Sequence, residues 1–170
     1  CRTPRSTCPA TKRAQLAQRM PRGSMLSVGL DRSSTEKFIS ALSIDIAAIN
    51  GAKSTVVAGE KSAIAELQAR LGDADIGCML LATSHAFHSR MMSGMVQEFE
   101  AFLATFDLQT PAVPMISTVT GQQETALFQD KTYWAQQILR PVDFLAAAQT
   151  LGTFADLHVE VAAKSALAQT

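Results

Sequence analysis

The stretch Ile44-Asp-Ile-Ala-Ala-Ile-Asn-Gly-Ala-Lys-Ser-Thr-Val-Val-Ala-Gly59 decides the fold that the sequence predicts. Positions 44–49 and 54–58 are rich in small and β-branched residues, which is typical of β-strands. Asn50-Gly51 stands between these two runs, and this dipeptide favours a tight turn. We therefore expect a β-hairpin with its turn at Asn50-Gly51.

A strand and a helix are predicted on each side of the hairpin. Positions 25–30 have the pattern of a strand, and positions 33–42 have that of a helix. After the hairpin, an apolar helical face over 64–71 is followed by an apolar run over 75–83. The resulting order, strand-helix-strand-strand-helix-strand, is typical of a ferredoxin-like unit. We therefore predict an α/β fold with a ferredoxin-like (βαββαβ) small subdomain over residues 23–84.

The residues on either side of this unit have a different pattern. Residues 1–22 contain a polar tail and a short helix over 12–20, and residues 85–170 contain several helices but only a marginal sheet. We expect both to be parts of a larger α/β lobe that this sequence does not complete. In such a piece the stripe from Met92 to Phe106 would stay exposed and favour aggregation. The segments predicted after residue 85 are helices over 91–106, 133–139 and 144–148, and strands over 115–119 and 157–161.

Composition excludes several classes of protein. The chain has 170 residues, of which 47% are hydrophobic and 18% charged, and its 15 basic and 15 acidic residues balance. It can bury a core, and it lacks the charge bias of a protein that binds nucleic acid or an anionic membrane. No apolar run approaches the ~20 residues that a membrane-spanning helix needs. The cysteines Cys1, Cys8 and Cys78 are odd in number and lack metal-ligand spacing, so we expect reduced thiols in a cytoplasmic protein.

The candidate site is the segment Ser84-His85-Ala86-Phe87-His88-Ser89, which follows an apolar run. His85 and His88 could share a metal ion, but no third ligand stands at the spacing of a zinc site, so we predict no metal. A histidine can also serve a nucleophile as its general base. The sequence has no Gly-x-Ser-x-Gly elbow to present a serine. From the residues alone, a structural loop and a general base without its nucleophile both stay open.

Several segments together resemble the acyltransferase domain of modular or iterative polyketide synthases, which is related to malonyl-CoA:acyl carrier protein transacylases. They stand in family order and at family spacing, and they cover most of the chain. The likeness fades before residue 12, and Ala162-Ala163 stands where the family usually has Gly-Pro. The matching segments are Arg13-Ala-Gln-Leu-Ala-Gln18, Gly23-Ser-Met-Leu-Ser-Val28, Ala47-Ala-Ile-Asn50, Val56-Val-Ala-Gly59, Ser84-His-Ala-Phe-His-Ser89, Ile116-Ser-Thr-Val-Thr-Gly121 and Tyr133-Trp-Ala-Gln-Gln-Ile-Leu-Arg-Pro-Val-Asp-Phe144.

The resemblance implies a fold and a reaction. The family has an α/β-hydrolase-like lobe with an inserted ferredoxin-like lobe. A serine in a Gly-His-Ser-x-Gly elbow takes malonyl from malonyl-CoA as an ester and passes it to the phosphopantetheine thiol of an acyl carrier protein, without metal or bound cofactor. That elbow would precede Arg13 and is absent here. We therefore expect a C-terminal portion of such a domain, inactive alone, whose parent also contains neighbouring domains such as a ketosynthase.

The resemblance also assigns roles to five residues. His88 matches the general base. Arg13 matches the arginine that binds the extender carboxylate, which a planar guanidinium can hold through two bonds. His85 and Phe87 belong to the His-Ala-Phe-His motif of malonyl-selective domains, in which Phe87 would occupy the space of an α-methyl group. Thr118 matches a residue whose backbone carbonyl orients the histidine.

Two other functions stay open. One is a discrete malonyl-CoA:acyl carrier protein transacylase of fatty-acid synthesis, although the His-Ala-Phe-His motif favours the synthase domain. The other is a non-catalytic module in which residues 23–84 bind a small metabolite, because a fold does not by itself determine a function. None of these alternatives predicts a nucleic acid or a membrane as a partner.

Overall fold

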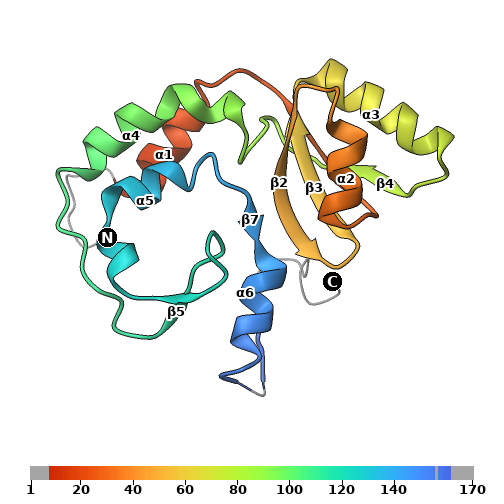
Figure 1. Cartoon of the computed structure of the whole chain (residues 1–170). Helices are drawn as coiled ribbons and strands as arrows, with labels where there is room; N and C mark the ends of the chain where they lie inside the picture. The colour runs from red at the N-terminus through yellow and green to blue at the C-terminus, as the bar shows by residue number, and fades with distance from the viewer. Residues whose placement is uncertain (1–7, 156, 162–170) are drawn as a thin grey trace.

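The computed structural model describes residues 8–155 and 157–161. Its main sheet has five strands in the order β4-β1-β3-β2-β7 (Figure 1). Neighbouring strands are antiparallel, except that β2 and β7 are parallel. The strands are β1 (Ser24–Val28), β2 (Ile44–Gly51), β3 (Ser54–Gly59), β4 (Cys78–Leu80) and β7 (Val142–Asp143).

Two helices cover one face of this sheet. Helix α2 (Arg32–Ile39) connects β1 to β2, and helix α3 (Lys61–Asp73) connects β3 to β4. Helix α2 begins after Asp31, whose side chain accepts a hydrogen bond from the Ser34 backbone N–H at 3.0 Å. The order β1-α2-β2-β3-α3-β4 confirms the alternation predicted for this part of the chain. Strand β4 is shorter than the predicted strand over 75–83.

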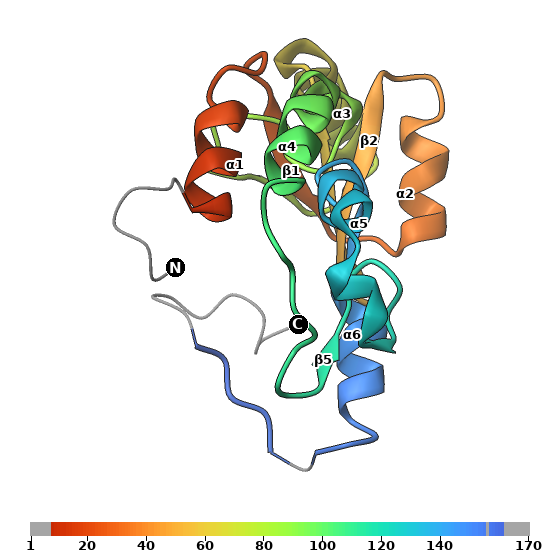
Figure 2. The ribbon, with the colours of Figure 1, turned by 90° about the vertical axis from the view of Figure 1, so that its left-hand side faces the viewer.

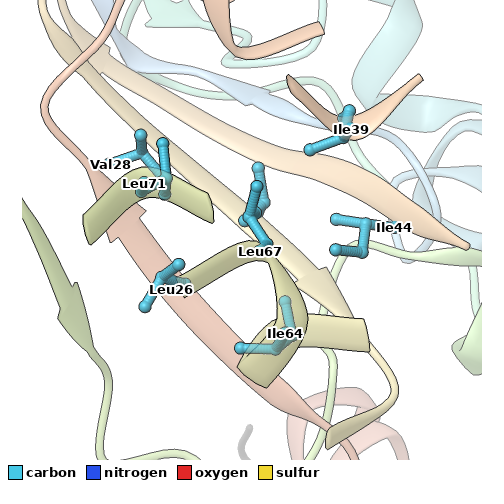
Figure 3. Packing of buried hydrophobic residues seen from close by; sticks show 8 residues of the cluster. Leu26, Val28, Ile39, Ile44, Ile64, Leu67 and Leu71 are labelled. Carbon is cyan, nitrogen blue, oxygen red and sulfur yellow. The ribbon is translucent and has the colours of Figure 1, made fainter. Parts of the chain in front are cut away.

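The main hydrophobic core lies between these helices and the sheet (Figure 3). Ile64, Leu67 and Leu71 of α3 are at most 1% exposed, and their spacing places them on one face of the helix. They share this core with Leu26 and Val28 of β1. Burial of one such side chain contributes ~1.5–3 kcal/mol, so α3 is held on the sheet mainly by packing.

The turn of the hairpin lies two residues later than predicted. Strand β2 continues through Asn50 and Gly51, and Gly51 pairs with Ser54, so residues 52–53 form the turn. The pairing shifts in register between Ile49 and Gly51, which leaves Asn50 as an extra residue in the strand. The prediction of a turn at Asn50-Gly51 is wrong because a bulge accommodates this dipeptide instead.

A second group of helices packs beside the sheet, and α1 and α4 lie side by side in it (Figures 1 and 2). The stripe from Met92 to Phe106 was expected to stay exposed, which is wrong for most of its length. Met92, Met95, Phe99 and Leu103 are at most 4% exposed, because Leu16 and Ala17 of α1 and Ile138 fill the space against them. The elements of this group are α1 (Pro9–Ala17), the 3-10 helix η1 (Arg90–Met95), α4 (Val96–Leu103) and α5 (Lys131–Gln136).

The last part of the described chain is less regular than predicted. Strand β5 (Met115–Ile116) pairs with β6 (Gln123–Glu124) and is shorter than the predicted 115–119. Gly121 lies between them with a φ of 69°, which favours glycine. A short 3-10 helix η2 (Ala126–Gln129) and helix α6 (Phe144–Leu151) complete the fold. The described residues 157–161 form no strand, so that prediction is wrong. The apolar side chains Leu157, Val159 and Val161 are at least 76% exposed, and a strand is stable only where one of its faces packs against other elements.

Some predictions concern residues outside the described ranges. These residues are 1–7, which include Cys1 and most of the predicted tail, and Ala162-Ala163. The tail ends earlier than predicted, because Pro9 already stands in the first turn of α1, where proline is tolerated. Cys8 and Cys78 are free thiols. Among residues 8–155 and 157–161, none of the helices is both long and apolar enough to span a bilayer.

Candidate active site

The segment 84–89 lies on the face of the sheet opposite to α3. Its residue Ala86 is fully buried, and Arg22 and His85 form an antiparallel bridge. A Cβ atom added to Gly23 would lie 2.7 Å from the Cβ atom of Ala86, so only glycine permits this close approach. The segment is thereby anchored on the sheet. Ala86 packs against strand residues that alternate with those of the main core: Met25, Ala47, Val56 and Ala58.

His88 has a backbone φ of 56°, in the left-handed region. For a residue other than glycine this conformation costs about 1–2 kcal/mol, and such residues concentrate at functional sites. Ser89 stabilises the turn, because its Oγ donates to the Ala86 carbonyl at 2.6 Å and accepts from the Met91 N–H at 3.2 Å. The turn therefore gives the His88 imidazole a defined direction.

The His88 ring is held through its Nδ1 atom. This atom lies 3.0 Å from the Arg140 carbonyl oxygen and 3.2 Å from that of Gln137. Both partners are acceptors, so Nδ1 carries the proton and Nε2 keeps the lone pair. A neutral imidazole held in this way can accept a proton at Nε2, as a general base must.

Thr118 does not supply the carbonyl that orients His88. Its carbonyl oxygen accepts a hydrogen bond from the Asp143 N–H at 2.6 Å, whereas the orienting carbonyls belong to Gln137 and Arg140. The prediction for Thr118 is wrong because a main-chain carbonyl leaves no mark in the identity of its residue. The sequence does contain one indication of the orienting carbonyls. Pro141 ends a helical segment, and the last carbonyls of a helix lack hydrogen-bond partners within the helix.

Arg13 and the segment 84–89 line one cavity with a volume of about 430 Å³. Helix α1 places Arg13 in the wall of this cavity, which His85, Phe87 and His88 also line. The four side chains predicted to bind substrate or to act as a base are therefore brought together. The other lining residues are mostly apolar: Ala10, Ala14, Ala17, Gln18, Ser84, Met92, Met95 and Ile138.

His85 and Phe87 form one wall of this cavity, with ring centroids 5.9 Å apart and planes inclined by 51°. His85 is only 6% exposed, and its Nδ1 lies 2.8 Å from the Ser84 hydroxyl. Phe87 is partly buried and packs against both the sheet and the helix group. Its ring therefore occupies a defined part of the cavity.

The two basic groups of the cavity differ in charge near neutral pH. Burial lowers the pKa of His88, and the positive charge of Arg13 lowers it further, although the bonds to the Arg140 and Gln137 carbonyls act in the opposite direction. Burial also lowers the pKa of Arg13, but a guanidinium stays protonated in proteins. The cavity therefore holds a neutral base and a cation.

The chemistry of the cavity is that of proton transfer and anion binding. An imidazole can move a proton, and a guanidinium can bind a carboxylate through two parallel bonds. In the described part of the chain, no three histidine, cysteine, aspartate or glutamate side chains gather so that they could hold a metal ion.

The lowered pKa of His88 predicts how the stability of the chain depends on pH. The unfolded chain takes up a proton near pH 6.5, whereas folded His88 resists it until a lower pH. The free energy of unfolding should therefore fall as the pH falls below about 6.5, with a slope of at most about 1.4 kcal/mol per pH unit from this one proton. Urea unfolding between pH 7.5 and 5.5 measures this slope. His88→Gln should make the free energy of unfolding less dependent on pH. His158→Gln, at an exposed position, should leave this dependence unchanged. Equal slopes in both variants would contradict the assignment.

Comparison with known proteins identifies the family. The acyl transferase domain family matches residues 8–170. The phenolphthiocerol synthesis polyketide synthase type I Pks15/1 of Mycobacterium marinum (strain ATCC BAA-535 / M) is 32% identical over 161 residues, which are 91% of this chain and 8% of that protein. The solved acyltransferase domain from the second module of the salinomycin polyketide synthase is similar with a TM-score of 0.80 and 33% identity, over 85% of this chain and 35% of that chain. The malonyl CoA-acyl carrier protein transacylase from Burkholderia pseudomallei has a TM-score of 0.77 and 29% identity, over 85% and 51% of the two chains.

The chain belongs to the acyl transferase domain family. More particularly, it matches the acyltransferase domains of type I polyketide synthases, and the resemblance found in the sequence motifs is thereby confirmed. The chain spans 35% of the length of the salinomycin chain and 8% of the length of the mycobacterial synthase.

Proposed function

We propose that this chain takes part in the transfer of malonyl from malonyl-CoA to the phosphopantetheine thiol of an acyl carrier protein, within a polyketide synthase. One observation carries the proposal: His88 and Arg13 line the same cavity, so a neutral base stands near a cation that can bind a carboxylate. Similarity to the Burkholderia transacylase supports malonyl and a carrier protein as the substrate and the acceptor.

In the proposed reaction His88 moves one proton in each half. Its Nε2 takes the proton of a serine hydroxyl while the serine oxygen bonds to the thioester carbonyl carbon, and it returns this proton to the coenzyme A thiolate when the C–S bond breaks. In the second half Nε2 takes the proton of the phosphopantetheine thiol while the thiol sulfur bonds to the ester carbonyl carbon, and it gives this proton to the serine oxygen when the ester C–O bond breaks. The serine must come from outside these 170 residues, since they contain no Gly-x-Ser-x-Gly sequence.

Arg13 binds the free carboxylate of the malonyl group in this proposal. A guanidinium and a carboxylate form two parallel bonds, which orient the substrate as well as attract it. The positive charge of Arg13 lowers the pKa of His88. A bound carboxylate would offset this charge, so substrate binding makes His88 a stronger base at the moment when a base is needed.

The proposal extends to the surroundings of the site. The partners are malonyl-CoA, the acyl carrier protein and neighbouring synthase domains such as a ketosynthase, with no bound cofactor. The location is the cytoplasm, where the free thiols Cys8 and Cys78 would stay reduced. Residues 23–84 would form the ferredoxin-like subdomain, and 1–22 and 85–170 would belong to a hydrolase-like lobe. The antiparallel order β4-β1-β3-β2 with its two helices supports this division.

The test joins this chain to the preceding part of the salinomycin acyltransferase domain, the part that carries the serine elbow in this family. This fusion and the chain alone are each incubated with radiolabelled malonyl-CoA and then with an acyl carrier protein. We expect label on the fusion, its transfer to the carrier protein, and no label on the chain alone. Stable label on the chain alone would contradict the proposal, as would a folded fusion that takes up none. The corresponding part of the Burkholderia transacylase provides a second fusion if the first does not fold.

Arg13→Ala should raise the KM of the fusion for malonyl-CoA about 10- to 150-fold, because it removes the charged hydrogen bonds to the carboxylate. The KM of Arg13→Lys should lie between those of the parent fusion and Arg13→Ala, since lysine keeps the charge but loses the planar guanidinium. Steady-state kinetics measure the effect. Arg19→Ala is the matched control, because the Arg19 side chain is 63% exposed and contacts Glu98 outside the cavity. Equal KM values in the two alanine variants would remove Arg13 from the substrate site.

Phe87→Ala should weaken the preference of the fusion for malonyl over methylmalonyl. The missing ring leaves room for the α-methyl group, and one methyl group in a pocket is worth ~1–3 kcal/mol, or about 10- to 200-fold in specificity. Competition between the two coenzyme A thioesters measures the ratio of their kcat/KM values. Phe154→Ala, at a side chain that is 64% exposed and outside the cavity, should leave the ratio unchanged. An unchanged ratio in Phe87→Ala would show that this ring does not contact the α-carbon.

A further inference from the structure

We infer that Asp45 and Arg90 are a positioning pair, through which strand β2 sets the place of the His88 imidazole. Arg90 stands two residues after His88, and Asp45 lies in β2, far from it in sequence. Neither Asp45 nor Arg90 lines the cavity that holds His88, so the pair would act through His88. The inference rests on the proposed role of His88 as a general base.

Arg90 binds Asp45 through its side chain and its backbone. The Nε atom lies 3.0 Å from both carboxylate oxygens, and Nη2 lies 2.6 Å from Oδ1. The backbone N–H of Arg90 donates to Oδ2 at 2.8 Å. The guanidinium bonds fix the orientation of the carboxylate, and the backbone bond then holds the main chain just after His88 rather than only the end of a flexible side chain.

Asp45 is directed at the same face of the sheet as the segment 84–89. It alternates with Ile44 and Ile46, which pack in the core below the helices, so its side chain emerges on the opposite face. The Asp45 side chain is 23% exposed and that of Arg90 is 66% exposed. Partial burial acts to raise the pKa of Asp45, but the bonds from Arg90 outweigh it and lower the pKa overall. The pair is therefore charged near neutral pH.

Strand β2 also supports the carbonyls that bind the His88 ring. Its residues Ala48 and Ile49 pair with β7, which begins two residues after Arg140. Within the strand, Asp45 and Ala48 are three residues apart, which is roughly 10 Å. One strand thus holds both the backbone that follows His88 and the chain that carries the acceptors of its Nδ1 proton.

A bulge in β2 lies between these two contacts. Ile46 pairs with Val57 and Ala48 pairs with Val56, so Ala47 is an extra residue on β2. Ala47 is fully buried and packs in the same cluster as Ala86 of the segment 84–89. A bulge changes the direction of the side chains on either side of it, and bulges are frequent beside active sites. Here the bulge sets the direction of the Asp45 side chain, which bonds to Arg90, relative to the residues of β2 that pair with β7.

The Asp45–Arg90 pair should affect the position of His88 more than the free energy of unfolding of the chain. An exposed ion pair contributes little to the free energy of unfolding. A left-handed backbone at a histidine, by contrast, persists only where several neighbours hold it in place. The Arg90 bonds to Asp45, the Ser89 turn and the bonds at Nδ1 are the constraints that act on His88. Loss of the pair should therefore loosen His88 while the fold remains.

The test uses the 170-residue chain and the variants Arg90→Ala, Arg90→Lys and Asp45→Asn. Arg70→Ala is the matched control, because Arg70 and Glu66 form an exposed ion pair on α3. Nitrogen NMR of the histidine rings reports on His88, and the rate of its modification by diethyl pyrocarbonate reports on its access. We expect the His88 signals to move and the rate to rise about two- to fivefold in Arg90→Ala and Asp45→Asn, the range that loss of an exposed ion pair allows. In Arg90→Lys the His88 signals and the modification rate should lie closer to those of the parent chain. In Arg70→Ala both should equal those of the parent chain.

Neither readout involves acyl transfer, so the outcome separates this inference from the proposed function. A fusion that fails to transfer malonyl would overturn the function, while a response of His88 in Arg90→Ala would still show that the pair positions it. Unchanged His88 signals in folded Arg90→Ala and Asp45→Asn would overturn the inference. Loss of the whole fold in all three variants, seen by circular dichroism, would overturn it as well, since the pair would then serve stability.

Discussion

Replacement of His88 by alanine is expected to slow malonyl transfer by the fusion about 10²- to 10⁴-fold, the range that a general base contributes. The variant loses the atom that takes the serine proton, but it keeps Arg13 in the cavity. The loss should therefore appear in kcat, and KM for malonyl-CoA should change little. Single-turnover measurements with radiolabelled malonyl-CoA separate formation of the ester from its transfer to the carrier protein.

Two controls show whether this loss is chemical. His158→Ala, at an exposed histidine that does not line the cavity, should keep the full rate. His88→Gln keeps a polar side chain of similar size and should be as slow as His88→Ala, because an amide cannot take up the proton. Transfer by folded His88→Ala within about threefold of the parent fusion, far less than general-base catalysis contributes, would exclude His88 as the base.

Leu67→Ala is expected to destabilise the chain by ~2–5 kcal/mol, which is a large part of the stability of a domain of this size. Leu67 is fully buried between α3 and the sheet (Figure 3), so its truncation removes apolar contacts and leaves a cavity that the rigid strands cannot fill. Urea unfolding followed by circular dichroism measures the change in the free energy of unfolding.

Leu80→Ala is the matched control for this substitution. The chemical change is the same, but Leu80 lies at the edge strand β4 with 53% of its surface exposed. Its truncation should change the free energy of unfolding by no more than about 0.5 kcal/mol. Similar losses in both variants would mean that α3 does not hold the core in the way that its buried face indicates.

The elements predicted with the correct type share a strong local pattern. In α3, apolar residues recur at Ile64, Leu67 and Leu71, and this spacing alone indicates a helix with one buried face. The two runs of the hairpin are predictable because both are rich in β-branched and small residues. The position of the turn was not predictable, because the pairing of Gly51 with Ser54 outweighed the local preference of Asn50-Gly51.

Other features depended on partners that are distant in the chain. The stripe from Met92 to Phe106 is expected from the sequence to stay exposed, yet most of it packs against two segments that are distant in the chain, α1 and the region of α5 and Ile138. Strand β7 has two residues and no alternating pattern, and it exists because β2 offers it backbone partners. Such pairings follow from the packing of the whole chain and leave no periodic signal in the sequence.

The candidate site shows the same division. His85, Phe87, His88 and Arg13 are predictable from the sequence because their side chains match family motifs, and the structure brings them to one cavity. Thr118 was named wrongly, because its role required a backbone carbonyl and any residue has one. The carbonyls that orient His88 follow α5, whose end is set by Pro141 and by the packing of that segment.

The sequence by itself determined the alternation of strands and helices over 24–80, the family, and the side chains that can move a proton or bind a carboxylate. Only the tertiary structure decided what surrounds them: the cavity shared by Arg13 and His88, the carbonyls at Nδ1, and the Asp45–Arg90 pair that joins β2 to the segment after His88. The physical reason is that local patterns arise from side chains a few positions apart. Contacts between distant segments depend on backbone groups, which are the same in every residue, and on how the whole chain packs.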